Sequence, residues 1–189
     1  IKLHPDRIAT YSYAHLPDRF RAQKRIVESD LPDAATRLAL IGQTVETLTA
    51  AGYRYIGLDH FALPEDDLAC AQRQGTMQRN FQGYSLHMAD DLLGLGVSAI
   101  SQMGDFYLQN ERELDAYYRL VESGQMPFTR GCKVTTEDKL RRYIIMSLIC
   151  DLRLDIGDCN RRFGIDFTTR FQQELAALVP MASDGLLEI

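Results

Sequence analysis

The side chains best suited to bind a ligand are concentrated in one short segment, Arg79 to Tyr84 (RNFQGY). It combines a cation, two amides, two aromatic rings and a glycine, and it lies between two predicted ordered elements. Loops with this chemistry often shape pockets. A loop that only covers a core could use similar residues, but the density of hydrogen-bonding groups favours a binding site.

A second candidate is Asp59-His60-Phe61, which directly follows a predicted strand. In parallel α/β folds, ligands bind at the carboxyl ends of the strands. A carboxylate beside an imidazole could act on a ligand there. An aspartate that caps a helix beside a hydrogen-bonded histidine would give the same pattern, so the sequence leaves both interpretations open.

Two further patterns carry less information. Gly94-x-Gly96-x-x-Ala99 has the spacing of a dinucleotide fingerprint, but the glycines lie inside an apolar run and no helix follows directly. Glycine inside a strand more often marks a bulge or a close approach. The cysteines lack metal-ligand spacing, so we expect buried thiols and no metal site; they are Cys70, Cys132, Cys150 and Cys159.

Charge and composition exclude several classes of function. The net charge of −5 argues against a general affinity for nucleic acid or anionic membranes. Only four of the 21 basic residues are lysine, and the arginine fork suits carboxylates and phosphates. Because no run has the length of a membrane span and no signal peptide is visible, we expect a cytoplasmic protein without a membrane partner.

The first 125 residues have an α/β pattern. A strand, a helix and a second strand form the unit of a parallel sheet, and a short helix, a buried strand and a further helix capped by Asn110 and Glu113 follow. The predicted elements are strand Arg7–Tyr13, a helix from Pro32 to Gly52, strand Tyr53–Leu58, helix Glu65–Gln74, strand Leu92–Ile100 and a helix from Asn110 to Gly124.

The remaining residues, 126–189, form a predicted second domain that is mainly helical. Gln125–Val134 is expected to link the two domains, and Asp184-Gly185 is expected to turn into a final strand. Three helices followed by the start of a hairpin are typical of a winged helix. The predicted helices begin at Thr135, cover Asp158–Phe163, and run from Phe167 to Leu178 before Pro180. The last helix carries one arginine and one glutamate, so a nucleic-acid partner is not expected.

Five motifs together resemble one enzyme family along essentially the whole chain. That family is oxygen-independent coproporphyrinogen III oxidase, a radical S-adenosylmethionine enzyme of bacterial haem synthesis. The motifs are Tyr13–Pro17 (YAHLP), Gly57–Ala62 (GLDHFA), Arg79–Tyr84 (RNFQGY), Gly94–Ser101 (GLGVSAIS) and Ser147–Cys150 (SLIC).

The resemblance implies the C-terminal part of a partial (β/α) radical-SAM barrel, followed by a truncated, winged-helix-like domain. It also implies an oxidoreductase that converts two propionates of coproporphyrinogen III into vinyl groups, giving protoporphyrinogen IX. Two S-adenosylmethionine molecules and a [4Fe-4S] cluster are the implied cofactors. By position, Ala14 and Ile100 match residues that line the S-adenosylmethionine sites, and Gln82 matches one beside them.

A substrate with four propionates needs cationic partners. Arg79, beside the site segment, is our first candidate, and Arg21 and Arg25 follow. The other implied partner is an electron donor to the cluster.

The family's cluster-binding C-x-x-x-C-x-x-C run has no counterpart here. We therefore expect the chain to be the C-terminal portion only of a longer enzyme, with no cluster, no catalytic residue and no activity of its own. The parent is expected to be a monomer, and the piece alone to self-associate through an exposed sheet edge. Alternatives are a related radical SAM haem chaperone or haem-degrading enzyme, and a non-catalytic winged-helix binding module.

Overall fold

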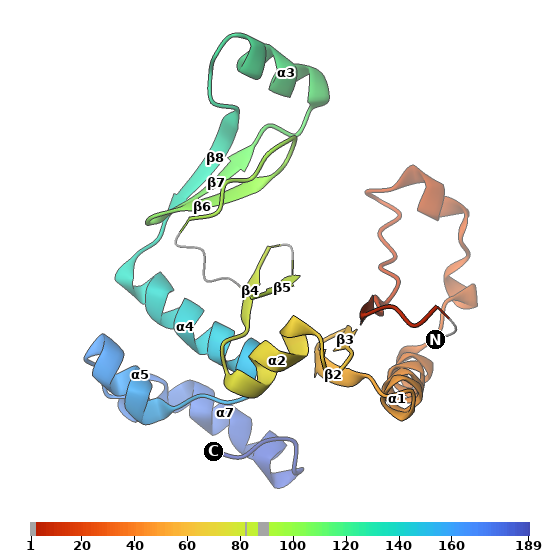
Figure 1. Cartoon of the computed structure of the whole chain (residues 1–189), viewed down its shortest axis with the longest axis vertical. Coiled ribbons are helices and arrows are strands. Elements are labelled where there is room, and N and C mark those ends of the chain that lie inside the picture. Colours follow the sequence, from red (N-terminus) through yellow and green to blue (C-terminus); the bar gives the residue numbers. More distant parts are fainter. Residues whose placement is uncertain (1–2, 82, 87–90) are drawn as a thin grey trace. The chain divides into compact units, whose positions relative to one another are not determined.

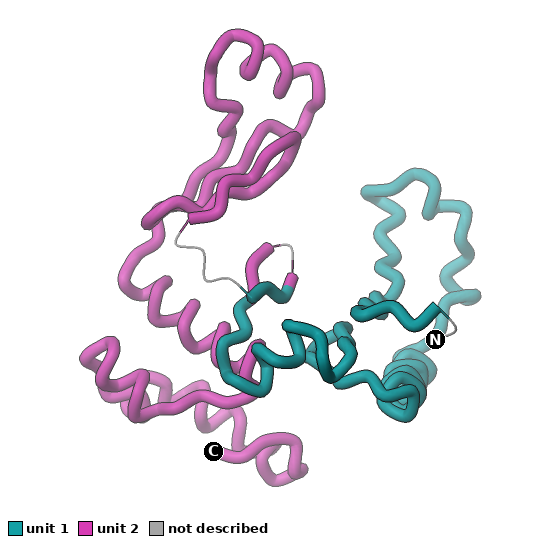
Figure 2. Tube along the Cα trace, viewed as in Figure 1, with its two compact units in different colours: residues 1–78, 84–86 teal, residues 79–83, 87–189 magenta. Residues whose placement is uncertain are grey.

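The computed structural model describes residues 3–81, 83–86 and 91–189. The chain divides into two compact units, which Figure 2 colours separately. Unit 1 comprises residues 1–78 and 84–86, and unit 2 comprises residues 79–83 and 87–189. Among the described residues, no helix has the length and apolar character needed to cross a membrane.

Unit 1 contains a small sheet of three strands, in the order β1 (Arg7–Ala9), β3 (His60–Ala62) and β2 (Arg54–Gly57). Both pairings are antiparallel, so the predicted parallel pairing is wrong. The chain reverses directly after β2, where Gly57 and Leu58 both have positive φ angles (146° and 50°). That reversal inserts β3, which no pattern predicted, between the two predicted strands.

The long helix of unit 1 is α1 (Ala34–Ala50) (Figure 1). The Asp33 carboxylate accepts a hydrogen bond of 2.7 Å from the Thr36 amide, so the helix begins slightly later than predicted. Leu48, near the end of the helix, joins Tyr53 and Phe61 in the core, whereas Leu38 and Ile41 nearer its start are exposed. The remaining elements of unit 1 are two 3-10 turns, η1 (Arg21–Arg25) and η2 (Glu28–Asp30), and helix α2 (Asp67–Gln74).

Boundaries between the two units along the chain fall within strands β4 (Gln78–Asn80) and β5 (Gly83–Ser85). These two strands form a two-stranded sheet. The segment singled out in the sequence, Arg79 to Tyr84, lies in these strands and in the turn that joins them. Gln82 lies outside the described residues.

The sheet of unit 2 is antiparallel and runs β6 (Ile100–Met103), β7 (Phe106–Asn110) and β8 (Phe128–Lys133) (Figure 1). The predicted strand Leu92–Ile100 is wrong: Leu92 forms one isolated bridge, and β6 begins only at Ile100. The intervening chain turns at Gly96 and Ser98, whose φ angles are 93° and 56°.

Two further predictions in this region are wrong. Asn110 does not cap a helix, because it is the buried last residue of β7, and helix α3 (Leu114–Glu122) starts after Glu113. The predicted linker Gln125–Val134 contains β8, which is exposed along most of its length and held by backbone pairing with β7. The domain boundary between residues 125 and 126 stays a prediction.

The C-terminal helices follow the sequence more closely. The predicted cap of α4 (Thr136–Asp151) is confirmed, since Thr135 and Asp138 form a reciprocal capping box. The helices pack around Leu140, Cys159, Phe167 and Phe171. The other helices are α5 (Ile156–Phe163), α6 (Phe167–Arg170) and α7 (Gln172–Ser183).

The chain end departs from prediction in two ways. Helix α7 continues through Pro180, which has no N–H group to donate to the carbonyl four residues earlier. The turn at Asp184-Gly185 forms, but the expected strand does not, and residues 187–189 have no regular secondary structure.

Candidate functional site

The segment Tyr13–Leu16 borders a cavity of about 1170 Å³ within unit 1. Ala14, predicted from the family resemblance to line a cofactor site, is one of its lining residues. Gln23 fixes the local backbone, because its side chain donates to the Ala14 carbonyl at 3.0 Å and accepts from the Leu16 amide at 2.5 Å. Residues from α1 form another part of the wall.

The pair Asp59 and His60 lies at the same cavity, where Asp59 is part of the wall. The Asp59 Oδ1 and His60 Nδ1 atoms are 2.6 Å apart. The rings of Tyr11 and Tyr84 meet the imidazole edge-on, at centroid distances of 6.2 and 5.2 Å.

This geometry decides between the two interpretations of Asp59. The residue that caps the next helix, α2, is Asp66, whose carboxylate accepts from the Leu68 amide at 2.7 Å. The helix-cap interpretation of Asp59 is therefore wrong. The carboxylate instead orients an imidazole and faces a cavity, where it can accept hydrogen bonds from a ligand.

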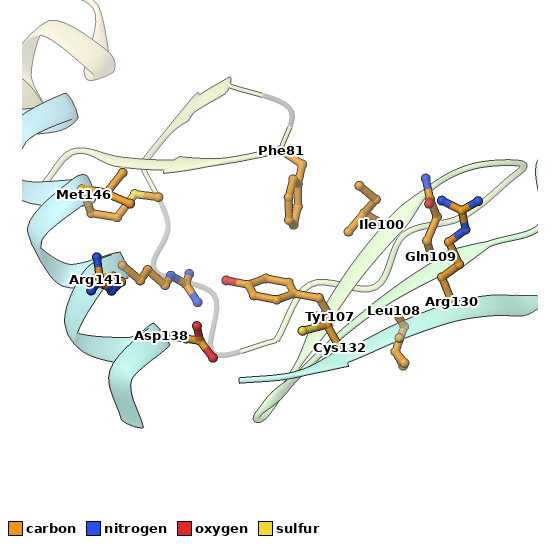
Figure 3. A pocket seen from close by; sticks show the side chains of 13 residues that line it. Phe81, Ile100, Tyr107, Leu108, Gln109, Arg130, Cys132, Asp138, Arg141 and Met146 are labelled. Carbon is orange, nitrogen blue, oxygen red and sulfur yellow. The ribbon is translucent and has the colours of Figure 1, made fainter. Parts of the chain in front are cut away.

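Unit 2 has its own cavity, of about 670 Å³, between α4 and the sheet strands β7 and β8 (Figure 3). Ile100, the second predicted cofactor-site residue, lines it, and so does Phe81 from the site segment. The Phe81 ring meets the Tyr107 ring edge-on at a centroid distance of 5.5 Å. Figure 3 shows both rings projecting into this space, with Ile100 beside them.

Three arginine side chains also line the unit 2 cavity. Arg130 extends from β8, and Arg141 and Arg142 extend from α4. The guanidinium carbon of Arg142 lies 5.9 Å from the centre of the Tyr107 ring, in cation–π geometry. This cavity therefore offers aromatic surface and positive charge together.

The three predicted substrate-binding arginines lie elsewhere. Arg79 is half-buried on β4 and lines neither cavity. Burial raises the pKa of the Cys150 thiol, and the nearby Arg79 charge partly opposes that rise in pKa. Arg21 and Arg25 are exposed in η1. Their roles stay predictions.

The cysteines divide into two groups. Cys150 and Cys159 are buried, as expected, and burial raises the pKa of each thiol. The expectation is wrong for Cys132, which is exposed at the rim of the unit 2 cavity, while Cys70 is half-buried. Within residues 3–81, 83–86 and 91–189, no cluster of three or more His, Cys, Asp or Glu side chains could hold a metal ion.

Sequence reasoning missed Tyr107, Arg130 and Arg142. Residues 125–134 have the composition of a linker, and the prominent feature of α4 is its apolar stripe. No periodic signal marks them, because the consecutive residues Arg130, Gly131 and Cys132 all line the cavity.

Comparison with known proteins identifies relatives along the whole chain. Residues 134–189 match the family described as the HemN C-terminal domain. The chain is 49% identical over 189 residues to oxygen-independent coproporphyrinogen III oxidase from Pseudomonas aeruginosa, covering 100% of this chain and 41% of that protein. The protein of the same name from Salmonella typhimurium is 47% identical over 188 residues, with the same two coverages.

A solved structure gives the same result. Coproporphyrinogen III oxidase from Escherichia coli, described as a radical SAM enzyme, matches with a TM-score of 0.93 and 45% identity. The match covers 100% of this chain and 43% of that chain. The resemblance read from the motifs and the α/β fold class are confirmed, and the chain spans 41% of the length of the two curated relatives.

Proposed function

We propose that the protein carrying this chain is an oxygen-independent coproporphyrinogen III oxidase. It would oxidatively decarboxylate two propionates of coproporphyrinogen III to vinyl groups and release protoporphyrinogen IX. The observation that carries this proposal is the 49% identity to a curated enzyme of that name along all 189 residues. The similarity of fold to a radical SAM enzyme at 45% identity supports it.

The proposed cofactors are two S-adenosylmethionine molecules and a [4Fe-4S] cluster. When bound, they supply the radical chemistry that removes hydrogen from a propionate. The described residues contain no cluster of metal ligands, so we assign no cluster ligand to them.

The unit 1 cavity fits a nucleoside-containing cofactor. Its wall includes the Tyr11 ring, on which a base can pack, and the Asp59 carboxylate, which can accept hydrogen bonds from ribose hydroxyls. Ala14 would contact the cofactor there. In unit 2, Ile100 would line an S-adenosylmethionine site with apolar surface and help to exclude water. Gln82 is proposed to lie beside these sites.

The remaining expectations are proposals as well. Arg79, Arg21 and Arg25 would bind substrate propionates, and an electron donor would reduce the cluster. We propose that the full-length enzyme is a cytoplasmic monomer and that this chain alone is inactive, forms no cluster and self-associates.

The test is an anaerobic assay of the full-length protein with coproporphyrinogen III, S-adenosylmethionine and a reductant. We expect formation of protoporphyrinogen IX that depends on S-adenosylmethionine, measured as the porphyrin after oxidation. Stable retention of haem without any conversion would instead support a haem chaperone and contradict the proposal.

A further inference from the structure

The cavity of unit 2 is lined by two arginines that lack a carboxylate partner among the described residues. Neither Arg130 nor Arg142 forms an ion pair with any acidic side chain of the described residues. Both line the cavity. Positive charge beside apolar surface suits a ligand that carries both carboxylates and an apolar body.

The third arginine of this cavity is different. Arg141 Nε lies 2.7 Å from Glu137 Oε1, and its guanidinium carbon lies 5.9 Å from the centre of the Phe171 ring. The Arg141 guanidinium is therefore already engaged by Glu137 and Phe171 within the C-terminal helices. This contrast singles out Arg142 and Arg130 as the groups available to a ligand.

The acidic side chain at the cavity is also engaged. Asp138 is the only carboxylate among the described residues that line it. Its Oδ2 atom accepts hydrogen bonds from Thr135 N at 2.8 Å and from Thr135 Oγ1 at 2.6 Å, as part of the α4 cap. The cavity as a whole is consequently positive.

Arg142 is held in place by aromatic packing. Its half-buried guanidinium faces the Tyr107 ring, and Tyr107 in turn contacts Phe81. A guanidinium in cation–π contact can still bind a carboxylate through its N–H groups with two parallel hydrogen bonds. The Phe81 and Tyr107 rings and the Arg142 guanidinium thus place apolar aromatic surface beside a carboxylate-binding group.

We propose that Arg142 and Arg130 bind propionate carboxylates of the tetrapyrrole substrate, whose apolar ring system packs against Tyr107. This inference rests on the proposed function and names substrate contacts that sequence reasoning did not select. A volume of about 670 Å³ is within the usual range for small-molecule sites. The ligand is recognised by its combination of an apolar macrocycle and peripheral carboxylates.

The experiment measures binding of coproporphyrin III, the stable oxidised form of the substrate, to the full-length protein by fluorescence titration. Arg142→Gln and Arg130→Gln should each raise the Kd roughly tenfold or more, because each loses a charge-assisted hydrogen bond. Arg142→Lys keeps the charge but loses the fork, so its Kd should lie between those of wild type and Arg142→Gln. Arg119→Gln, an exposed change on α3 outside the cavity, is the matched control and should bind like wild type.

A neutral ligand tests the role of the carboxylates directly. The tetramethyl ester of coproporphyrin III keeps the macrocycle but lacks the negative charges. It should bind wild type more weakly than the acid does, and the two Arg→Gln variants should bind it as wild type does. Far-ultraviolet circular dichroism confirms that the variants are folded.

The outcomes separate this inference from the proposed function. If wild type converts coproporphyrinogen III while both Arg→Gln variants keep the wild-type Kd, only the inference is overturned. If the variants lose affinity for S-adenosylmethionine and keep that for coproporphyrin III, the arginines bind the cofactor carboxylate instead, which also overturns it. If wild type neither binds nor converts the tetrapyrrole, the proposed function fails, and the inference fails with it.

Discussion

Gly94 lies against the backbone of Ile100, so closely that a Cβ atom at residue 94 would be 2.7 Å from the Ile100 carbonyl oxygen. Side chains secure the same contact: Ser101 Oγ accepts from the Gly94 amide at 3.0 Å, and Asn110 Nδ2 donates to the Gly94 carbonyl at 3.1 Å. The first glycine of the apparent dinucleotide pattern therefore serves a close approach of two backbone segments. It positions the start of β6, and with it a residue of the unit 2 cavity.

Gly94→Ala should destabilise the protein, because the backbone of Ile100 has to move to admit the methyl group. We expect a loss of about 1–3 kcal/mol in the free energy of unfolding, measured by urea denaturation of the full-length protein. Gly42→Ala on α1 is the control, since a Cβ atom at residue 42 would have no neighbouring atom within 4 Å; it should be neutral or stabilising by about 0.5–1 kcal/mol. Equal effects of the two changes would refute this explanation.

The pairing of Asp59 with His60 gives a second prediction. Asp59→Ala leaves the imidazole Nδ1 without its partner at 2.6 Å and should cost about 1–2 kcal/mol in unfolding free energy. The catalytic efficiency should also fall, because Asp59 faces the unit 1 cavity. Asp18→Ala, an exposed change in a loop outside that cavity, should stay within about 0.5 kcal/mol of wild type. A variant at residue 59 with wild-type stability and activity would show that the pair has no role.

How far the sequence could predict the structure depended on local signals. The cap of α4 was predictable because Thr135 and Asp138 form a capping box within four residues. The pairings of β1 with β3 and of β7 with β8 were not, because they join segments distant in sequence, and β8 has no apolar alternation to identify it. For the same reason Arg130 and Tyr107 were not selected, whereas Ala14 and Ile100, each of which lines a cavity, were selected through the family motifs.

Thiol reactivity tests the burial of the cysteines. Cys132 is exposed, whereas burial shields Cys150 and raises its pKa, which lowers the thiolate fraction. In the native protein at pH 8, iodoacetamide should therefore label Cys132 much faster than Cys150 or Cys159. Mass spectrometry of the digested protein measures this, and denaturation in urea should equalise the rates. Comparable labelling of Cys150 and Cys132 before denaturation would contradict the packing of α4.

The helix caps predict a loss of stability in acid. Hydrogen bonds from the Thr135 side chain and backbone lower the pKa of Asp138, and those from the Thr169 side chain and backbone lower the pKa of Asp166. A carboxyl group whose pKa is lowered by folding stabilises the folded state at pH values above its pKa in the unfolded chain, which is about 3.9. This contribution is lost as the pH falls through the pKa of the folded state. Stability should thus decline below about pH 4. Asp151, whose pKa burial raises, acts in the opposite direction.

Asp138→Asn isolates one of these contributions. The variant should be less stable than wild type at pH 7, and the difference should shrink as the pH is lowered from 5 to 3. Thermal unfolding at a series of pH values measures it. A difference that stays constant over this range would show that the Asp138 charge does not contribute.

The most direct test of the proposed function follows the carboxyl carbons of the substrate. Coproporphyrinogen III labelled with carbon-13 in its propionate carboxyl groups is incubated without oxygen with the full-length protein, S-adenosylmethionine and a reductant, and the released gas is measured by mass spectrometry. Because two of the four propionates become vinyl groups, we predict two labelled CO₂ molecules for each protoporphyrinogen IX formed. Consumption of S-adenosylmethionine with no labelled CO₂ would contradict the assignment as a coproporphyrinogen III oxidase.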